Sequence, residues 1–198
     1  MTRTPEAILE YAKTRPEGTP VCAKELLHLG ERAAVDQALS RLVRRKKLIR
    51  AGRGLYVRPV ETKFGTRTPS ASRLVEAFAN LRGETIAPHG AAAANTLGLT
   101  TQVPVREIYL TSGRSRRLQL GAQTVELQHA PRWLLAPKSR LAGETIRALA
   151  WLGPEHATDA VRTLKQKLTR EEIDEIAAAR AQAPQWIAER MSELIVDG

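Results

Sequence analysis

The chain has little of the chemistry that disulfides, metal sites and membrane spans need. Cys22 is the one cysteine among 198 residues, so no disulfide can form within the chain. The four histidines are His28, His89, His129 and His156. They are too far apart in the sequence to form a local pair of metal ligands. No apolar run approaches the roughly 20 residues that span a bilayer, and the first residues lack the apolar core of a secretory signal. We therefore expect a cytoplasmic protein with no metal, no other cofactor and no membrane partner.

Catalytic motifs are also absent. The sequence contains no G-x-x-x-x-G-K-[ST], H-E-x-x-H or G-x-S-x-G motif. These patterns organise phosphate-binding loops, zinc sites and serine nucleophiles, so we do not expect an enzyme. A sequence does not show which carboxylates converge in space, and a nuclease site that uses Glu84, Glu107 or Glu126 stays open as an alternative.

Positive charge is what the chain has in excess, and this charge is concentrated towards the N-terminus. The formal net charge is +10 and the sequence pI is near 10.3. Residues 1–60 carry 13 basic and 6 acidic residues, residues 61–140 carry 11 and 5, and residues 141–198 carry 7 and 10. A basic excess attracts polyanions, and nucleic acid is the polyanion we expect to meet the first part of the chain. A protein-interaction module with an incidental basic surface is a further alternative.

The first thirty residues predict two short helices. Thr4 is a typical N-cap, and Pro16 and Gly18 stop the helical pattern that follows it. A second helix is expected at about residues 23–29, because Gly30 suits a left-handed C-terminal cap. Both helices precede the most basic segment.

A third helix, from about residue 31 to residue 46, is expected to have one apolar and one polar face. The apolar face is formed by Val35, Ala38, Leu39 and Leu42. The opposite face carries Ala33, Asp36, Gln37, Ser40, Arg41 and Arg44. Arginine and glutamine pair bidentately with guanine and adenine edges, and small residues let a helix approach the major groove closely. The pattern predicts a recognition helix, whereas an arginine-bearing surface helix that only adds solubility is the alternative.

The segment "LIRAGRGLYVRP" predicts a β-hairpin with glycines at its turn and Arg53 at its tip. Three short helices followed by a two-stranded wing is the order of a winged helix-turn-helix, in which the wing contacts the flanking DNA backbone. We therefore expect double-stranded DNA as the partner. The predicted DNA-binding residues are Arg32, Gln37, Ser40, Arg41, Arg44, Arg45, Lys46, Lys47, Arg50, Arg53, Arg58, Lys63 and Arg67.

The run "GERAAVDQALSRLVRRKKLIRAGRGLYVRP" resembles the N-terminal winged helix of AbiEi-type antitoxins, the autorepressing partners in type IV toxin–antitoxin modules. "RGLY" is the most specific piece, and residues 90–154 resemble the C-terminal domain of the same family. By position, the resemblance suggests Gln37, Arg41 and Arg44 for base contacts and Arg53 for the wing. Lys46 and Lys47 occupy a turn where such domains often use glycine.

The AbiEi resemblance implies a transcriptional repressor that binds inverted repeats in its own promoter. It also implies that the protein is an antitoxin, with a nucleotidyltransferase-like toxin as its protein partner. The alternative is a stand-alone winged-helix regulator whose C-terminal half senses or recruits something else.

The rest of the chain predicts a second, α+β domain. We expect the winged helix-turn-helix in residues 1–60, a linker in residues 61–68, and a C-terminal α+β domain in residues 69–198. That domain would combine a small antiparallel sheet with a helical tail. In the tail, Gly153 would end one helix and "TREE" at residues 169–172 would cap another.

Arg114, Arg116 and Arg117 fall together in the predicted strand-rich region. They could form a second phosphate contact or a protein-binding patch. Charged side chains also commonly guard the edges of sheets.

Overall fold

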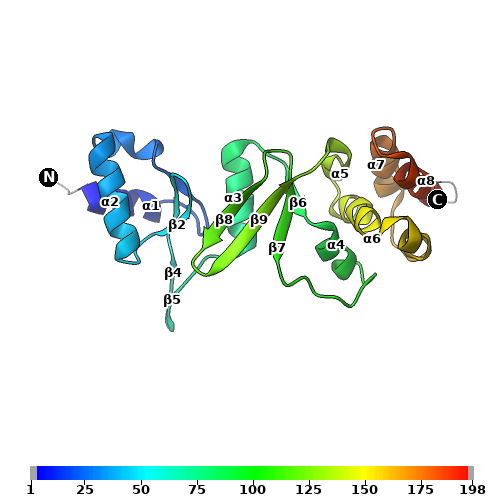
Figure 1. The fold of residues 1–198 in the computed structure, drawn as a ribbon, viewed down its shortest axis with the longest axis horizontal. Coiled ribbons are helices and arrows are strands. Elements are labelled where there is room, and N and C mark those ends of the chain that lie inside the picture. The colour runs from blue at the N-terminus through cyan, green and yellow to red at the C-terminus, as the bar shows by residue number, and fades with distance from the viewer. Residues whose placement is uncertain (1–3, 196–198) are drawn as a thin grey trace. The chain divides into compact units, whose positions relative to one another are not determined.

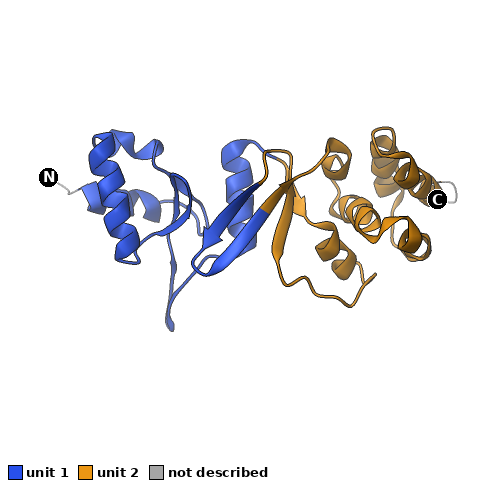
Figure 2. Cartoon of the chain, viewed as in Figure 1, with its two compact units in different colours: residues 1–84, 116–126 blue, residues 85–115, 127–198 orange. Residues whose placement is uncertain are grey.

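The computed structural model describes residues 4–195 and shows helices and strands interspersed along the chain (Figure 1). Within these residues there are eight α-helices and three small β-sheets. The α+β class that the sequence predicts is confirmed. The chain divides into two compact units, which Figure 2 colours separately. Unit 1 comprises residues 1–84 and 116–126, and unit 2 comprises residues 85–115 and 127–198.

Unit 1 begins with alternating helices and short strands. Its first elements are α1 (Thr4–Lys13), β1 (Val21–Cys22), the 3₁₀ helix η1 (Glu25–Leu29), α2 (Arg32–Arg44), β2 (Ile49–Gly52) and β3 (Leu55–Val57). The second of the predicted helices is thus a 3₁₀ helix, which is common for helical runs this short. The three strands form one sheet in the order β1-β3-β2, with antiparallel pairing throughout.

The apolar face of α2 fixes this helix on the first core of unit 1. Val35, Ala38, Leu39 and Leu42 are all buried, as the periodicity predicts. Full burial of an aliphatic side chain contributes roughly 1.5–3 kcal/mol, so this face determines the orientation of the helix. The buried residues of this cluster are Ile8, Ala12, Val21, Ala23, Leu26, Val35, Ala38, Leu39, Leu42, Leu48 and Tyr56.

Helix α2 ends at Arg44, two residues before the predicted end near Lys46. The backbone of Lys46 has a φ of 56°, in the left-handed region. Its N–H donates to the carbonyl of Val43 at 2.9 Å, and the N–H of Lys47 donates to the carbonyl of Leu42 at 2.9 Å. A residue with a Cβ costs roughly 1–2 kcal/mol in this conformation. The chain therefore turns at a lysine where glycine would be less strained.

The segment predicted as a linker forms a hairpin of its own. Strands β4 (Val60–Thr62) and β5 (Gly65–Arg67) pair antiparallel and form a separate two-stranded sheet. Unit 1 then continues through α3 (Ala71–Arg82) and takes in β8 (Arg116–Leu120) and the first part of β9 (Gln123–His129). The unit boundary accordingly differs from the predicted boundary at residues 60–68.

Contacts across unit 1 explain why it extends beyond residue 60. A Cβ on Gly52 of β2 would lie 3.8 Å from Leu118 of β8, and one on Gly18 would lie 2.8 Å from the Cβ of Arg73 in α3. Leu118 and Leu120 of β8 are buried. The wing-like strands therefore pack on a segment that lies far along the chain, and local sequence cannot indicate this.

Unit 2 is mostly helical. Its elements are β6 (Ile86–Pro88), α4 (Gly90–Thr96), β7 (Glu107–Thr111), α5 (Arg132–Leu135), α6 (Arg140–Lys165), α7 (Arg170–Arg180) and α8 (Gln185–Ile195). The third sheet has the strand order β6-β7-β9-β8, and β6 pairs antiparallel with β7. No helix within residues 4–195 has the length and apolar character to cross a membrane.

Two predicted helix boundaries in unit 2 are confirmed. Gly153 interrupts α6 with a φ of 74° and a ψ of 174°, at the kink before Pro154. Thr169 caps α7 in a reciprocal capping box with Glu172. The hydrogen bond from the Thr169 backbone N–H to the Glu172 carboxylate lowers the pKa of Glu172. A capping box and a glycine with positive φ depend on residues that are close in the sequence. Local sequence therefore suffices to predict these two helix ends.

Buried charge links two helices of unit 2. Arg147 of α6 is 5% exposed, and its Nη1 donates to the carbonyl of Leu134 in α5 at 3.2 Å. Burial lowers the pKa of Arg147 to about 10, although the nearby Glu144 carboxylate opposes this shift. Glu144 accepts a hydrogen bond from Arg140 Nε at 2.8 Å. Arg147 and Glu144 are thus each held by a hydrogen bond, Arg147 to the Leu134 carbonyl and Glu144 to Arg140.

Candidate nucleic-acid interface

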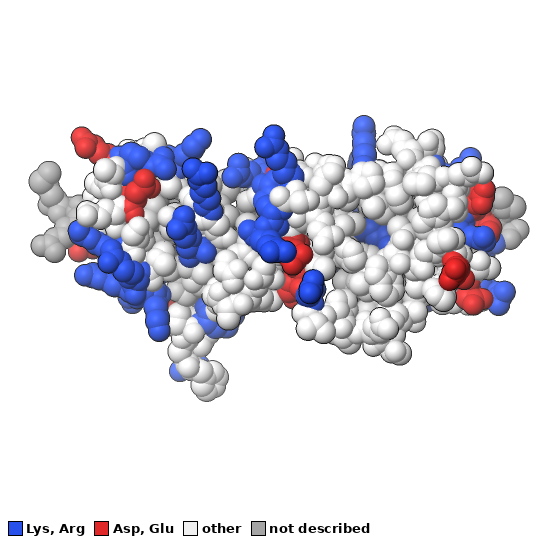
Figure 3. Space-filling model, in the orientation of Figure 1, with Lys and Arg blue, Asp and Glu red and all other residues white. Residues whose placement is uncertain are grey.

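The polar face of α2 is exposed, opposite the face that packs on the core. Gln37, Ser40, Arg41 and Arg44 all lie on this exposed side, together with Ala33. The structure thus brings the predicted base-contacting residues onto one helical surface. Figure 3 shows Lys and Arg side chains crowded over the part of unit 1 that contains α2 in Figure 1.

Contacts along α2 separate the tethered side chains from those that remain available. Arg32 Nε donates to Asp36 Oδ2 at 2.7 Å, and the Ser40 hydroxyl donates to the Asp36 carbonyl at 2.9 Å. Arg32 is therefore partly neutralised. Within residues 4–195, the side chains of Gln37, Arg41 and Arg44 have no hydrogen-bonding or ionic partner. These three groups can bind an external ligand without first breaking a contact.

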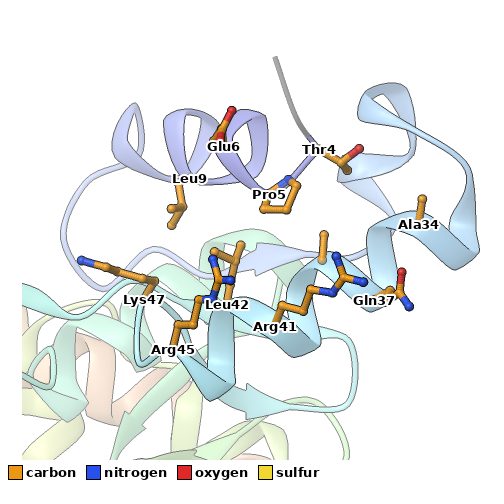
Figure 4. Close-up of a pocket in the computed structure, with 11 residues that line it drawn as sticks. Thr4, Pro5, Glu6, Leu9, Ala34, Gln37, Arg41, Leu42, Arg45 and Lys47 are labelled. Carbon is orange, nitrogen blue, oxygen red and sulfur yellow. The ribbon is translucent and has the colours of Figure 1, made fainter. Parts of the chain in front are cut away.

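A hollow of about 620 Å³ lies between α2 and the start of α1 (Figure 4). Its basic side chains come from Arg41 of α2 and from Arg45 and Lys47 in the turn that follows. Glu6 of α1 supplies the acidic residue of the lining. Three cations against one carboxylate favour an anion, and a phosphate group is small enough to enter this space. Sequence periodicity gave no sign of this hollow, because it depends on how α1 crosses α2.

The turn after α2 continues the basic surface towards β2. Arg45, Lys46 and Lys47 are all exposed, and Arg50 follows on the exposed side of β2. Exposed cations close together in a row repel one another, and a polyanion relieves this repulsion. The row therefore suits the regular phosphates of a nucleic-acid backbone.

Arg53 lies at the tip of the β2–β3 turn, as predicted, and is exposed. Gly54, with a φ of 67°, provides the backbone conformation that the turn requires. The Gly54 carbonyl accepts a hydrogen bond from the Ala23 N–H at 3.0 Å, which ties the turn to the segment before η1. Arg58 follows β3 and is half-buried. The guanidinium of Arg53 is thus presented on an anchored turn.

The two remaining cations of the predicted interface lie on the β4–β5 hairpin. Lys63 is at its tip, whereas Arg67 on β5 forms an ion pair with Glu17 at 3.2 Å. The structure also places Phe64 at this tip with 90% of its surface exposed. Phe64 was not among the predicted site residues, because a linker was expected here. The sequence does carry a signal for an exposed turn here, because Phe64 is followed by Gly65 and lies between Thr62 and Thr66.

The arginines of the second predicted patch have structural contacts. Arg116 pairs with Glu84 at 2.9 Å and lies over the ring of Phe78, 5.2 Å from its centroid. Arg117 lies 3.7 Å from Glu126. Two of the carboxylates considered for a nuclease are therefore each beside an arginine. Arg114 belongs to unit 2, whereas Arg116 and Arg117 belong to unit 1.

Metal-ligating side chains do not cluster in the described part of the chain. Among residues 4–195, no three His, Cys, Asp or Glu side chains are grouped so that they could hold a metal ion. Cys22 is half-buried, and burial raises the pKa of its thiol.

Comparison with known proteins identifies a solved structure with a similar fold and a family to which the chain belongs. No curated protein matches this sequence. The crystal structure of the RV2827C protein from Mycobacterium tuberculosis is similar, with a TM-score of 0.57 and 17% sequence identity. The match covers 98% of this chain and 77% of that chain, and it shows a shared fold. Residues 7–176 match the model of DUF6088, described as a family of unknown function, and because this match spans most of the chain, the protein belongs to that family.

Proposed function

We propose that this protein binds double-stranded DNA through α2 and regulates transcription from its own promoter in the cytoplasm. The observation that carries the proposal is the exposed face of α2, where Gln37, Arg41 and Arg44 lie together without protein partners among residues 4–195. These side chains have the donors that base edges in the major groove accept. On this proposal the protein acts as a regulator and not as an enzyme.

The order of elements in unit 1 supports a winged helix-turn-helix. Helices α1, η1 and α2 are followed by the β2–β3 hairpin, and β1 completes the small sheet. In winged-helix proteins, the helix before the hairpin enters the major groove and the hairpin contacts the flanking backbone. On this proposal α2 reads the bases, and Arg50 and Arg53 bind phosphates.

Salt dependence is the direct test of this function. With about five or six phosphates neutralised, log affinity for a duplex from the region upstream of the protein's own reading frame should fall with log salt at a slope of about −5. Fluorescence anisotropy of the labelled duplex at several salt concentrations measures this slope. A scrambled duplex of the same composition should bind more weakly at every salt concentration. A slope near zero, or no preference over the scrambled duplex, would contradict regulated promoter binding.

A second role as an antitoxin is proposed from unit 2. This unit has its own helical core and exposes large apolar side chains: Val103 at 74%, Val105 at 99% and Trp151 at 38%. A hollow of about 420 Å³, lined by Gln102, Trp151 and His156 among others, lies between α6 and the loop after α4. Val103 and Val105 lie two positions apart in the loop before β7, and contiguous exposed apolar surface is typical of protein-binding sites. The resemblance to AbiEi-type antitoxins makes a nucleotidyltransferase-like toxin the proposed partner.

Co-expression with the product of the adjacent reading frame tests the antitoxin role. The full-length protein should restore growth, and Val105→Asp should abolish rescue while promoter binding stays within about twofold of wild type, since α2 is unchanged. The Arg41→Ala/Arg44→Ala protein should still rescue. Loss of rescue in that double variant would instead mean that protection works through transcription alone.

A further inference from the structure

We propose that the β4–β5 hairpin is a second DNA-contacting arm and that Phe64 inserts between base pairs beside the sequence that α2 reads. The inference rests on the proposed DNA-binding function and deepens it. It assigns a wedge residue to a segment that carries no role in the winged-helix pattern. The tip of this hairpin combines an exposed aromatic ring with an adjacent ammonium group.

The hairpin has no core of its own. Among residues 4–195, strands β4 and β5 pair only with each other, and residues 61–67 are all exposed. An isolated two-stranded hairpin is only marginally stable in water. Its local contacts must therefore hold it, and the structure shows such contacts at both ends.

The turn is arranged to hold Phe64 outward. The Thr62 hydroxyl accepts a hydrogen bond from the Phe64 N–H at 3.2 Å and donates to the Gly65 carbonyl at 2.7 Å. Gly65 has a φ of 116°, which side-chain-bearing residues rarely adopt, and a Cβ there would have no atom within 4 Å. The glycine is thus required by backbone conformation and not by crowding. The backbone therefore positions Phe64 at the tip, where 90% of its surface is exposed.

The base of the hairpin is anchored near the basic end of α2. Arg67 pairs with Glu17 at 3.2 Å, and Glu17 also lies 3.6 Å from Arg73. A hollow of about 500 Å³ is lined by Arg67 at the hairpin base together with Lys46 and Arg50. The arm therefore starts beside the cations proposed to contact phosphates, which is the position that a second DNA contact requires.

The surroundings of Phe64 favour a nucleic acid over a protein as the molecule that covers it. Lys63 Nζ lies 5.0 Å from the centroid of the Phe64 ring, and the other neighbours at the tip are Thr62 and Gly65. A protein interface needs a larger apolar core than one ring. A single aromatic ring beside a cation suits a base stack between phosphates, where apolar wedges insert from the minor groove. Glu61 lies two positions before Lys63, in β4, and Lys63 is the cation at the tip beside Phe64.

Base unstacking tests this inference with the full-length protein. The probes are duplexes from the upstream region in which single adenines are replaced by 2-aminopurine, whose fluorescence rises when the base leaves the stack. Wild-type protein should raise the fluorescence at one step beside the α2 site. Phe64→Ala should return that signal to the level of the free duplex and weaken binding about tenfold. Phe64→Leu, which keeps an apolar wedge, should retain most of the signal.

The control for Phe64→Ala is a second exposed apolar side chain of unit 1. Leu81→Ala removes another exposed apolar side chain of unit 1, 38% exposed on α3, and should behave as wild type. If the wild-type protein binds the duplex but no position gains fluorescence, the wedge is wrong and the DNA-binding function stands. The wedge is also wrong if Phe64→Ala keeps the signal, or if it changes only the oligomeric state, which would make Phe64 a protein contact. If the wild-type protein does not bind the duplex at all, the proposed function itself fails.

Discussion

Replacing Arg41 and Arg44 together with alanine is expected to weaken binding to the cognate promoter duplex about 100-fold. Each bidentate contact between arginine and a base contributes roughly 1–3 kcal/mol of discrimination, so losing two such contacts gives an effect of this size. Both side chains are exposed and have no partner among residues 4–195, so their removal breaks no contact within the described protein. Alanine also has the highest helix propensity, so α2 should remain folded.

The comparison between duplexes decides what these arginines do. The double variant should lose much less affinity for a scrambled duplex than for the cognate one, because base contacts carry the sequence information. Arg53→Ala should weaken binding to both duplexes evenly, since its position on the turn suits a phosphate contact. Arg162→Ala, an exposed arginine of α6, is the charge-matched control and should stay close to wild type on both. Equal losses on both duplexes for the helix variant would contradict base reading by α2.

The sequence predicts α2 well because one helical period accounts for both of its faces. The burial of Val35, Leu39 and Leu42 and the exposure of Gln37 and Arg44 follow from the same 3.6-residue repeat. The hairpin after α2 was equally predictable, because glycines bracket its turn. In α2 and the hairpin after it, the local pattern and the tertiary packing favour the same structure. Under that condition the sequence alone is enough to predict the element.

Long-range pairing is what the sequence could not supply. β8 belongs to unit 1 although some thirty residues of unit 2, residues 85–115, precede it in the chain. Alternation in β8 predicts a strand but does not identify the element on which Leu118 packs. The short β6 and the four-residue α5 were also missed, since such short elements form only when their neighbours complete them.

The candidate site shows the same division between local and long-range information. The exposure of Arg41 and the position of Arg53 on a turn could be predicted from local pattern. The ion pair between Arg67 and Glu17, 50 residues apart, could not, nor could the contact between Arg116 and Glu84. These contacts tie two of the predicted DNA-contacting or patch arginines to carboxylates. We therefore expect Arg67 and Arg116 to contribute more to the structure of unit 1 than to binding.

Gly90→Ala is expected to destabilise unit 2 by about 2 kcal/mol. A Cβ at this first residue of α4 would lie 2.4 Å from the carbonyl oxygen of Arg147 and 2.5 Å from the Cβ of Trp151, both in α6. Neither atom belongs to a flexible side-chain end, so α4 and α6 must separate to accept the methyl group. Alanine would gain about 1 kcal/mol in helix propensity, whereas overpacking of this kind costs about 3 kcal/mol or more. The steric term therefore outweighs the gain in propensity.

Chemical denaturation of the full-length protein measures this effect, with tryptophan fluorescence as the probe because all three tryptophans, Trp133, Trp151 and Trp186, lie in unit 2. Thr96→Ala is the matched control: it lies at the exposed end of the same helix, raises helix propensity and meets no such obstacle. It should leave stability unchanged or slightly raised. Gly90→Ala should retain promoter binding at temperatures where unit 2 remains folded, because α2 and its core lie in unit 1. Antitoxin rescue should fall as unit 2 loses stability. If Gly90→Ala were as stable as wild type, α4 would not pack against α6 as closely as the structure shows, and the helical core proposed to support toxin binding would need a different arrangement.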